Sequence, residues 1–455
     1  MSQLLIIGGS DAGISAALRA REIDPSVNVA VVVADAFPNY SICGLPFYVS
    51  GEVPDWHSLA HRTREEIERE GIRLLLNHTA RAIDPVKKTV EVDDTTGRVQ
   101  SLSYDRLVIA TGAAPIRPPI AGLDLPGVYL LHTMEDSFRI HAHVTERHSQ
   151  SALIVGGGYI GLEMADALRH RGLQVTLVEM AEAVLPATVE VSLGRVVEDE
   201  LRRHAVEVIN QVAIESIQRE GSRLTVSGSP GFRKTVDLVL VSVGVRPANE
   251  LAATAGIHTG IRGAIRVSRE MATNVADIYA AGDCVETWHR VTKQSTYLPL
   301  GTTAHKQGWI AGENAVGGRH QFAGSLGTQV VKVFDLAVAR TGLREQEART
   351  AGFDPLSSES RVWDHKAYYP GAREILIHVI GDRRSGCLLG AQMVGHWQAE
   401  VAKRIDIFAT ALFHEMKLKD LNDLDLSYTP PLSSPWDPVQ MSAQAWVKAT
   451  ENLRD

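Results

Sequence analysis

The feature that most constrains the fold of this 455-residue chain is a unit of strand, glycine-rich turn and helix that occurs twice. The first unit has an apolar run over 3–7 and a helical stretch over 14–22; the second has an apolar run over 152–155 and a helical stretch over 162–169. Backbone N–H groups at the start of such a helix can face a pyrophosphate. We therefore predict two nucleotide-binding α/β units. The turn residues are Gly8, Gly9, Ser10, Asp11, Ala12 and Gly13 in the first unit, and Gly156, Gly158, Tyr159, Ile160 and Gly161 in the second.

An acidic residue follows the second strand of each Rossmann-like unit. Asp35 comes after the apolar run 29–33 and Glu179 comes after the run 174–178, each about 20 residues beyond the last glycine of its turn. A carboxylate at this place can accept hydrogen bonds from a ribose. Because Met180 and Ala181 offer no cation for a 2′-phosphate, the second unit favours NADH over NADPH.

Three further apolar runs, over 107–112, 238–244 and 278–283, are expected to be strands that end in glycine. They contribute Ala110, Thr111, Gly112, Gly244, Gly282 and Asp283 as candidate binding residues. Asp283 could hold hydroxyl groups of a second, longer cofactor. Beyond residue 318 no glycine nucleotide turn occurs. A strand over 328–339, another over 374–379 and an amphipathic helix over 399–415 predict a separate α+β domain there.

Cys43 is a lone thiol in the segment 39–48, downstream of the first glycine turn. The residues 44–46 read as the start of a helix, because proline suits a first helical turn. A helix N-terminus can lower the pKa of a thiol, and a lone activated thiol either exchanges with an external sulfur or is itself oxidised. A small buried residue is the alternative, which the neighbouring nucleotide turns disfavour. Cys284 is expected to be packed, and Cys387 to lie in a turn without a redox partner.

Composition argues against several classes of protein. A net charge of −8 without a long basic block disfavours a nucleic-acid binder. No apolar run reaches the ~18–20 residues of a membrane-spanning helix, and the early first strand leaves no room for a signal peptide. Because only three cysteines are present, we expect the reducing cytoplasm rather than a disulfide framework. No metal site is predicted, because none of the 17 histidines shows ligand spacing; His141, His143 and His148 are expected on a solvated helix.

Taken together, these motifs resemble the single-cysteine branch of the FAD-dependent pyridine nucleotide–disulfide oxidoreductases. That branch includes coenzyme A-disulfide reductases, NADH oxidases and peroxidases, and persulfide reductases. The resemblance covers essentially the whole chain. It rests on the first turn and on the segments 43–46, 110–112, 156–163, 281–283, 300–304 and 425–431.

The resemblance implies two Rossmann-like domains, one for FAD and one for NADH, plus a C-terminal α+β dimerisation domain. The expected FAD domain is discontinuous, over 1–115 and 250–320; the NAD domain covers 116–249 and the dimerisation domain 321–455. FAD would bind the first turn and Asp283, with Ala304 also among the cofactor-binding residues, and NADH the second turn. Tyr159 matches an aromatic gate over the nicotinamide pocket, and Glu163 a carboxylate near it. Tyr428, and either Tyr368 or Tyr369, would reach the active site of the partner in a homodimer.

The implied function is electron transfer from NADH through FAD to a sulfur bonded to Cys43 as a mixed disulfide, persulfide or sulfenic acid. The partner would be a small thiol-containing or sulfur substrate. Two alternatives stay open. One is an NADH oxidase that reduces oxygen through a sulfenic acid on Cys43. The other is a redox-responsive flavoprotein with little turnover.

Four positions depart from the pattern of the resembled family. Asp11 stands where NADH peroxidases have a histidine, which disfavours peroxidase activity because a carboxylate repels a thiolate. Ile42 and His305 stand where coenzyme A-disulfide reductases have asparagines, and Trp309 where an arginine is usual. These changes argue against coenzyme A disulfide as the specific substrate, while the sulfur chemistry is retained.

Overall fold

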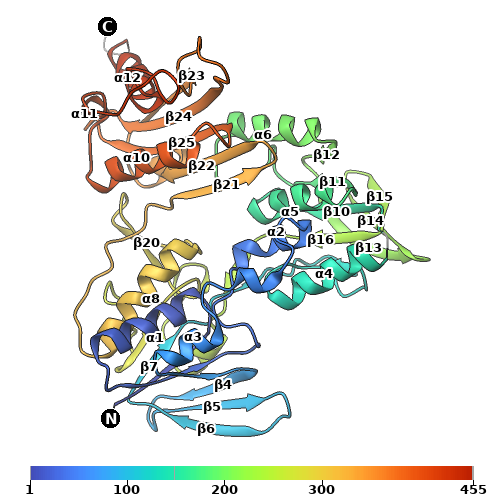
Figure 1. Ribbon diagram of the computed structural model, residues 1–455, viewed down its shortest axis with the longest axis vertical. Helices are drawn as coiled ribbons and strands as arrows, with labels where there is room; N and C mark the ends of the chain where they lie inside the picture. Colours follow the sequence, from blue (N-terminus) through green and yellow to red (C-terminus); the bar gives the residue numbers. More distant parts are fainter. Residues whose placement is uncertain (1, 148, 453–455) are drawn as a thin grey trace.

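The structure is a computed structural model that describes residues 2–147 and 149–452, and it contains three five-stranded sheets (Figure 1). The first sheet is parallel, in the order β18–β7–β1–β2–β3. Side chains alternate across β1, so Leu4 and Ile6 pack in the core that includes α1 and α8, while Leu5 and Ile7 pack in the core on the other face. The elements are β1 (Gln3–Ile7), β2 (Asn28–Val32), β3 (Ile72–Leu75), β7 (Arg106–Ile109), β18 (Ile278–Ala280), α1 (Asp11–Ile23) and α8 (Gly301–Ala315).

The helices α1 and α8 lie in very close contact, and glycine makes that contact possible. A Cβ added at Gly308 would stand 2.1 Å from the carbonyl oxygen of Ala12, and one added at Gly312 would stand 2.1 Å from that of Ala16. Only glycine therefore fits at these two positions of α8. This contact places the start of α8, at residue 301, next to the first glycine turn.

The second sheet repeats the parallel arrangement in the order β12–β11–β10–β16–β9. Its helix α4 does not fit the predicted solvated face. His143 is buried and bonded to the hydroxyl of Tyr129 at 2.8 Å, while His141 stacks on the ring of Tyr48; His148 lies outside the described residues. The elements are β9 (Val128–Tyr129), β10 (Ser151–Val155), β11 (Gln174–Val178), β12 (Val206–Ile209), β16 (Leu238–Val241), α4 (Met134–Glu146), α5 (Tyr159–His170) and α6 (Val191–Arg203).

The third sheet is antiparallel, in the order β21–β22–β25–β24–β23, and shares an apolar core with α10 and α12. The prediction of one strand over 328–339 is wrong. The chain reverses at Phe334, whose φ of 50° ends β21, and β22 returns beside it. The elements are β21 (Gln329–Val333), β22 (Leu336–Gly342), β23 (Pro355–Trp363), β24 (Glu374–Asp382), β25 (Leu388–His396), α10 (Val401–Phe413) and α12 (Pro438–Glu451).

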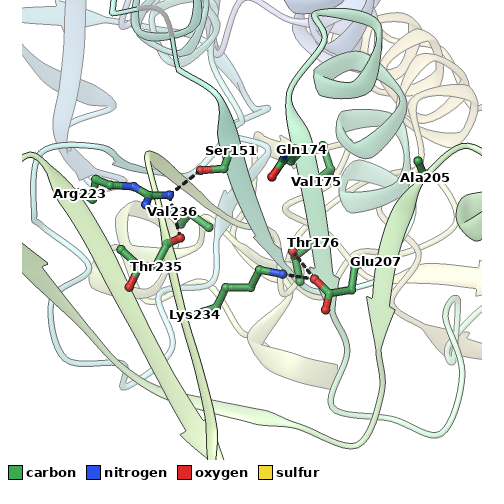
Figure 2. A pocket seen from close by; sticks show the side chains of 10 residues that line it. All are labelled: Ser151, Gln174, Val175, Thr176, Ala205, Glu207, Arg223, Lys234, Thr235 and Val236. Atoms are coloured by element: carbon green, nitrogen blue, oxygen red, sulfur yellow. Dashed lines mark hydrogen bonds and ion pairs between the residues drawn. The ribbon is translucent and has the colours of Figure 1, made fainter.

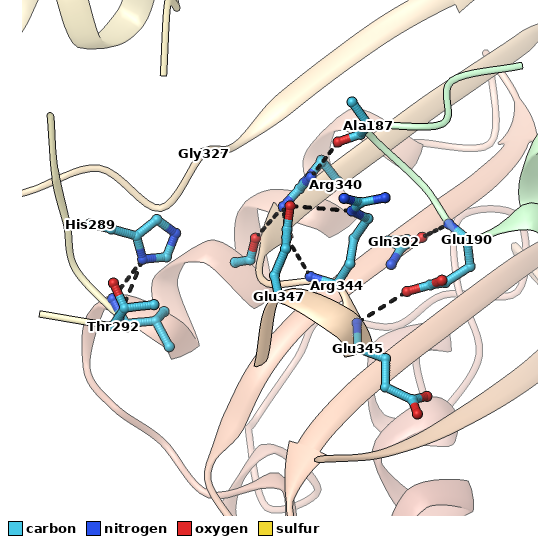
Figure 3. A network of polar contacts seen from close by, with 12 residues as sticks. Ala187, Glu190, His289, Thr292, Gly327, Arg340, Arg344, Glu345, Glu347 and Gln392 are labelled. Atoms are coloured by element: carbon cyan, nitrogen blue, oxygen red, sulfur yellow. Dashed lines mark hydrogen bonds and ion pairs between the residues drawn. The ribbon is translucent and has the colours of Figure 1, made fainter. Parts of the chain in front are cut away.

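A network of polar contacts joins the third sheet to the segment that precedes α6 (Figure 3). The side-chain oxygen of Gln392 accepts the N–H of Glu190 at 2.6 Å, and the carboxylate of Glu190 accepts the N–H of Glu345 at 3.1 Å. The buried guanidinium of Arg340 donates to the carbonyl of Ala187 at 3.1 Å. These bonds hold the C-terminal unit against the second nucleotide unit.

No described helix is both long and apolar enough to cross a membrane. The remaining elements of the chain are smaller. The smaller sheets are formed by β4 (His78–Asp84), β5 (Thr89–Asp94) and β6 (Val99–Ser103); β8 (Ala113–Pro115) and β17 (Val245–Pro247); β13 (Ala213–Glu220), β14 (Arg223–Ser229) and β15 (Phe232–Val236); β19 (Thr287–His289) and β20 (Gln294–Thr296). The remaining helices are α2 (Leu45–Ser50), α3 (Arg64–Arg69), α7 (Glu250–Thr254), α9 (Glu345–Thr350), α11 (Leu418–Leu421) and the 3-10 turns η1 (Ile42–Gly44), η2 (Trp56–Leu59) and η3 (Ile261–Gly263).

Candidate active site

The first glycine turn is built as a tight bend with free donors at the helix start. Gly8 has a φ of 116°, and a Cβ there would stand 2.0 Å from the carbonyl oxygen of Ala110. A Cβ at Gly13 would stand 1.9 Å from the oxygen of Gly8, so the bend excludes larger residues. Ser10 is the N-cap of α1 but makes no capping bond, which leaves the first N–H groups of α1 without a side-chain acceptor. This cradle fits a pyrophosphate.

The turn after β18 lies against the first glycine turn. A Cβ at Gly282 would stand 2.8 Å from the Cβ of Ala12 and 3.7 Å from the Cβ of Ala304, which is itself buried. Burial, with a smaller contribution from the nearby Asp11 carboxylate, raises the pKa of Asp283 to about 6. The structure therefore brings Gly282, Asp283 and Ala304 together with the first turn.

The remaining predicted residues of the first unit lie at the ends of neighbouring strands. Asp35 follows β2 and accepts the N–H of Phe37 at 2.8 Å. Ala110 donates its N–H to the carbonyl of Ile7, and the Thr111 hydroxyl donates to the carbonyl of Ala248 at 2.6 Å. Gly112 has a φ of 71°, in the left-handed region.

The second glycine turn repeats this geometry and is braced by its acidic residue. A Cβ at Gly161 would stand 2.0 Å from the oxygen of Gly156, whereas Gly158, the N-cap of α5, has open space beside it. Glu179 is buried, and its two oxygens accept the N–H groups of Gly157 at 2.7 Å and Ala181 at 2.8 Å. The predicted carboxylate therefore supports the turn. Gly244 follows β16 with a φ of 106°, and Ile160 is half-buried in the first turn of α5.

Tyr159 and Glu163 lie one helical turn apart on α5, and both are half-buried. Desolvation raises the pKa of Tyr159 and keeps its hydroxyl protonated. Desolvation also raises the pKa of Glu163 to about 7, with a further contribution from the negative charge of Asp166. The Glu163 carboxyl therefore keeps its proton to higher pH than an ordinary glutamic acid.

Cys43 lies in the 3-10 turn η1, directly before α2. Leu45 and Val49 of α2 are buried in the same core as Leu162 of α5, so α2, which follows the first unit's second strand, packs against the second unit. The Cys43 side chain reaches solvent, yet the surrounding protein raises the pKa of its thiol by desolvation. The carboxylates of Glu163, Asp11 and Asp283 raise it further, in that order.

The prediction that a helix N-terminus lowers the pKa of Cys43 is wrong, because the protein groups around the thiol raise its pKa. The helix α2 has only six residues, and desolvation of the thiol, followed by the charges of three nearby carboxylates, raises its pKa. Cys284 is fully buried, as predicted. The prediction that Cys387 lies in a turn is wrong: it follows the turn at 383–385 and forms an isolated antiparallel bridge with Lys417, half-buried and without a sulfur partner among the described residues.

Asp11 and His305, two of the four residues that depart from the family pattern, contact one another. The sequence did not indicate this contact. The Nε2 atom of His305 lies 3.3 Å from an Asp11 carboxylate oxygen, and its Nδ1 atom is bonded to the hydroxyl of Ser15 at 2.9 Å. Trp309, one turn further along α8, is covered by the guanidinium of Arg19 at 3.8 Å from the ring centroid. Arg19 is also paired with Glu22 and Glu313.

The three candidate tyrosines lie on two adjacent loops of the C-terminal unit. Tyr368 and Tyr369 lie between β23 and β24, and Tyr428 lies before α12; all three are exposed. The N–H of Lys366 donates to the carbonyl of Pro430, which joins the loops. Within the described part of a single chain, none of these tyrosines is hydrogen-bonded to Cys43.

The buried Arg404 of α10 supports both tyrosine loops. Its guanidinium donates to the carbonyl of Asp364 at 2.7 Å in one loop, and to the carboxylate of Asp437 at 3.2 Å beside the other. Sequence reasoning missed Arg404. Its position on the apolar face of the predicted amphipathic helix, three residues after Val401 and next to Ile405, is the signal that could have pointed to it.

A polar cavity of about 290 Å³ lies elsewhere in the second unit (Figure 2). Ser151 and Gln174, the first residues of β10 and β11, line it, so it opens at the amino ends of strands whose carboxyl ends carry the glycine turn. Lys234 is paired with Glu207 there, and the Arg223 guanidinium donates to the Ser151 hydroxyl at 3.1 Å. The cavity is distinct from the candidate active site.

One group among the described side chains has the spacing of metal ligands, namely Glu200, His204 and Asp335. Glu200 accepts the N–H of Asp335 at 2.9 Å and is paired with Arg203, while His204 stacks on Phe334. These contacts join α6 to the turn between β21 and β22. These three residues therefore form a contact between the second unit and the C-terminal unit.

Comparisons with known proteins agree with this geometry. Residues 2–308 match the family model described as pyridine nucleotide-disulphide oxidoreductase, and residues 328–438 match the dimerisation domain of the same family. An NAD(P)H sulfur oxidoreductase (CoA-dependent) of Pyrococcus abyssi is 34% identical over 441 residues, which cover 97% of each chain.

Two solved structures are similar over nearly the whole chain. The NAD-dependent persulfide reductase from A. fulgidus has a TM-score of 0.95 at 37% identity, covering 99% of this chain and 84% of that one. Reduced Bacillus anthracis CoADR-RHD has a TM-score of 0.95 at 33% identity, covering 99% of this chain and 81% of that one. The chain belongs to the pyridine nucleotide-disulphide oxidoreductase family.

Proposed function

We propose that this protein is an FAD-dependent oxidoreductase that uses NADH to reduce a small persulfide, polysulfide or disulfide through Cys43. The observation that carries the proposal is the position of Cys43 among carboxylates of both nucleotide units. Asp11 and Asp283 belong to the first unit, and Glu163 belongs to the second. A thiol at this junction can receive electrons that pass from a nucleotide on the second turn to a nucleotide on the first turn. Relatives named as sulfur and persulfide reductases support the sulfur chemistry.

The cofactor assignment follows the two turns. We assign FAD to residues 1–115 and 250–320, NADH to residues 116–249, and the dimer contact to residues 321–455. In this assignment the first turn, Asp35, residues 110–112, Asp283 and Ala304 hold FAD. The second turn, Glu163, Glu179 and Gly244 hold NADH. The exposure of Met180 beside Glu179, with no cation adjoining it in sequence, supports NADH over NADPH.

The reduction of a persulfide R–S–SH at Cys43 requires no reactant other than NADH and a proton. The Cys43 thiolate attacks the outer sulfur, forms Cys43–S–SH and releases R–S⁻. When bound, FAD supplies the two electrons of a hydride taken from NADH. Two electrons and one proton convert Cys43–S–SH into the Cys43 thiolate and H₂S. Glu163, with its pKa of about 7, can hold a proton beside Cys43 at neutral pH.

The substrate we favour is small. Ile42 and His305 replace side chains that could orient a pantetheine arm, and Arg19 is neutralised by Glu22 and Glu313 beneath Trp309. Arg19 is therefore not available to bind a bulky anionic substrate such as one that carries a phosphorylated pantetheine arm.

The exposed tyrosines support a catalytic role for the dimer. We propose that Tyr428 of the partner subunit, together with either Tyr368 or Tyr369, lies over Cys43 and protonates the departing sulfur. Large apolar side chains are exposed on the same loops, including Leu432 and Trp436. Burial of these side chains between two copies would stabilise the dimer. Because a free catalytic thiol needs a reducing compartment, we place the enzyme in the cytoplasm.

The deciding experiment replaces the thiol. Cys43→Ser is expected to keep its FAD and to be reduced by NADH at the wild-type rate, yet to lose at least about 100-fold in turnover with a persulfide or polysulfide. Cys387→Ser is the matched control and is expected to retain full turnover. Oxygen uptake and peroxide are measured in parallel, because turnover that persists with oxygen alone would assign an oxidase. Unchanged persulfide turnover in Cys43→Ser would refute the catalytic role of this thiol.

A further inference from the structure

The segment that carries Cys43 is docked on the first glycine turn. Asn39, buried with a φ of 57°, donates its N–H to the carbonyl of Gly9 at 2.7 Å, and its own carbonyl accepts the N–H of His61 at 3.0 Å. Asp11 follows Gly9 by two residues, and the ring of His61 lies 6.4 Å from the ring of His305. Cys43, Asp11 and His305 therefore belong to one small region.

The pair formed by Asp11 and His305 is oriented by contacts with α1 and α8. Both ring nitrogens of His305 are engaged by α1, one by Asp11 and one by Ser15. The glycine contact between α1 and α8 begins at Gly308, one helical turn after His305. A Cβ at Gly301, the first residue of α8, would stand 3.4 Å from the other Asp11 oxygen. The Asp11 carboxylate is thus set at the N-termini of two helices, where negative charge is favoured.

We propose that the Asp11–His305 pair sets how readily the Cys43 thiol ionises, with His305 as a positioning residue that acts by compensating the charge of Asp11. This inference deepens the proposed function, on which it rests. A protonated His305 offsets a carboxylate that otherwise opposes the Cys43 thiolate. Once His305 loses its proton, the full charge of Asp11 acts on the thiol.

The direction of the pH effect follows from the groups around each member. Cys43 faces Glu163 of α5, Asp11 of α1 and Asp283 after β18. His305 faces Asp11 and Ser15 of α1 and the ring of His61. The contact of its Nε2 atom with the Asp11 carboxylate raises the pKa of His305 above its usual range, so the compensating charge persists to higher pH than in an ordinary histidine and is lost in alkaline solution.

The test measures the thiol itself rather than turnover. The FAD-loaded enzyme is alkylated with iodoacetamide, an uncharged reagent, between pH 6 and 10, and the Cys43 peptide is followed by mass spectrometry. Asp11→Asn is expected to speed alkylation at pH 7 by about threefold, and His305→Asn to slow it by about threefold, which corresponds to pKa shifts of about half a unit in opposite directions. The double variant is expected to behave like Asp11→Asn, because His305 has no charge left to compensate.

Two controls separate electrostatics from loosened packing. His320→Asn removes another histidine that faces a carboxylate of α8, that of Glu313 at 3.5 Å, and should leave the Cys43 profile unchanged. His305→Gln serves if His305→Asn fails to retain FAD, and should also slow alkylation.

Shifts in the same direction for Asp11→Asn and His305→Asn, or no shift in either, would overturn the inference. Neither result would touch the proposed function, since Cys43→Ser tests that function by turnover.

Discussion

Single residues determine the chemistry of this site, and the sequence predicts their identities better than their effects. Cys43, Glu163 and Asp283 can each be picked out from the residues beside them. Their convergence depends on the packing of α2 against α5 and of the turn after β18 against the first glycine turn. The sign of the pKa shift at Cys43 therefore could not be read from the chain. The same holds for Asp11 and His305, whose contact joins positions 294 residues apart.

At this scale, Glu163 predicts a pH-dependent stability. Its pKa in the folded chain, about 7, lies above its ordinary value of 4.5, so the fold disfavours its ionised form. The penalty is absent below pH 4.5, grows between pH 4.5 and 7, and is complete above pH 7. Glu163→Gln should therefore melt with the wild type near pH 5 and be more stable at pH 8, by on the order of 2–3 kcal/mol.

Thermal scans of the FAD-loaded proteins from pH 5 to 8 measure this difference. Glu215→Gln, at an exposed position, is the matched control and should show no such trend. A stability difference for Glu163→Gln that is constant across pH would contradict the assignment.

Elements with a strong local signal were predicted closely. The predicted strands over 3–7 and 174–178 are β1 and β11, and the first helix begins three residues earlier than expected because Asp11 already belongs to it. The hairpin of β21 and β22 was missed because its turn contains no glycine, asparagine or proline, and Asp335 is the only polar residue in it. The close packing of α8 on α1 was missed as well, although Gly308 and Gly312 were its visible signal.

The second glycine turn predicts two different outcomes for the same substitution. Gly161→Ala places a Cβ 2.0 Å from the Gly156 oxygen, so it should lower the melting temperature and abolish flavin reduction by NADH. Gly158→Ala meets no protein atom within 4 Å, so it should leave the melting temperature unchanged. Its methyl group stands at the N-terminus of α5, where the pyrophosphate is assigned, and should raise the KM for NADH about tenfold.

Stopped-flow flavin reduction over a range of NADH concentrations, alongside thermal scans, separates the two variants. Equal destabilisation by both substitutions would show that Gly158 is needed by the fold rather than by the nucleotide.

The whole molecule divides its proposed catalytic groups between the two nucleotide units and the C-terminal unit. Cys43 and its carboxylates lie between the two nucleotide units, whereas the exposed tyrosines lie on loops that Arg404 holds together. The dimerisation domain of the family covers this part of the chain. The sequence could indicate the dimer only through resemblance, because an interface between copies leaves no periodic pattern in a chain.

This division predicts complementation between two inactive chains. Cys43→Ser lacks the thiol, and Tyr428→Phe should lower persulfide turnover at least about tenfold, because the departing sulfur loses its proton donor. In a mixed dimer, the intact Cys43 of the Tyr428→Phe chain faces the intact Tyr428 of the Cys43→Ser chain. Co-expressed and differently tagged chains, purified as heterodimers, should therefore recover about half of the wild-type turnover per dimer. Heterodimers no more active than the Tyr428→Phe homodimer would instead place Tyr428 at the active site of its own chain, or outside catalysis.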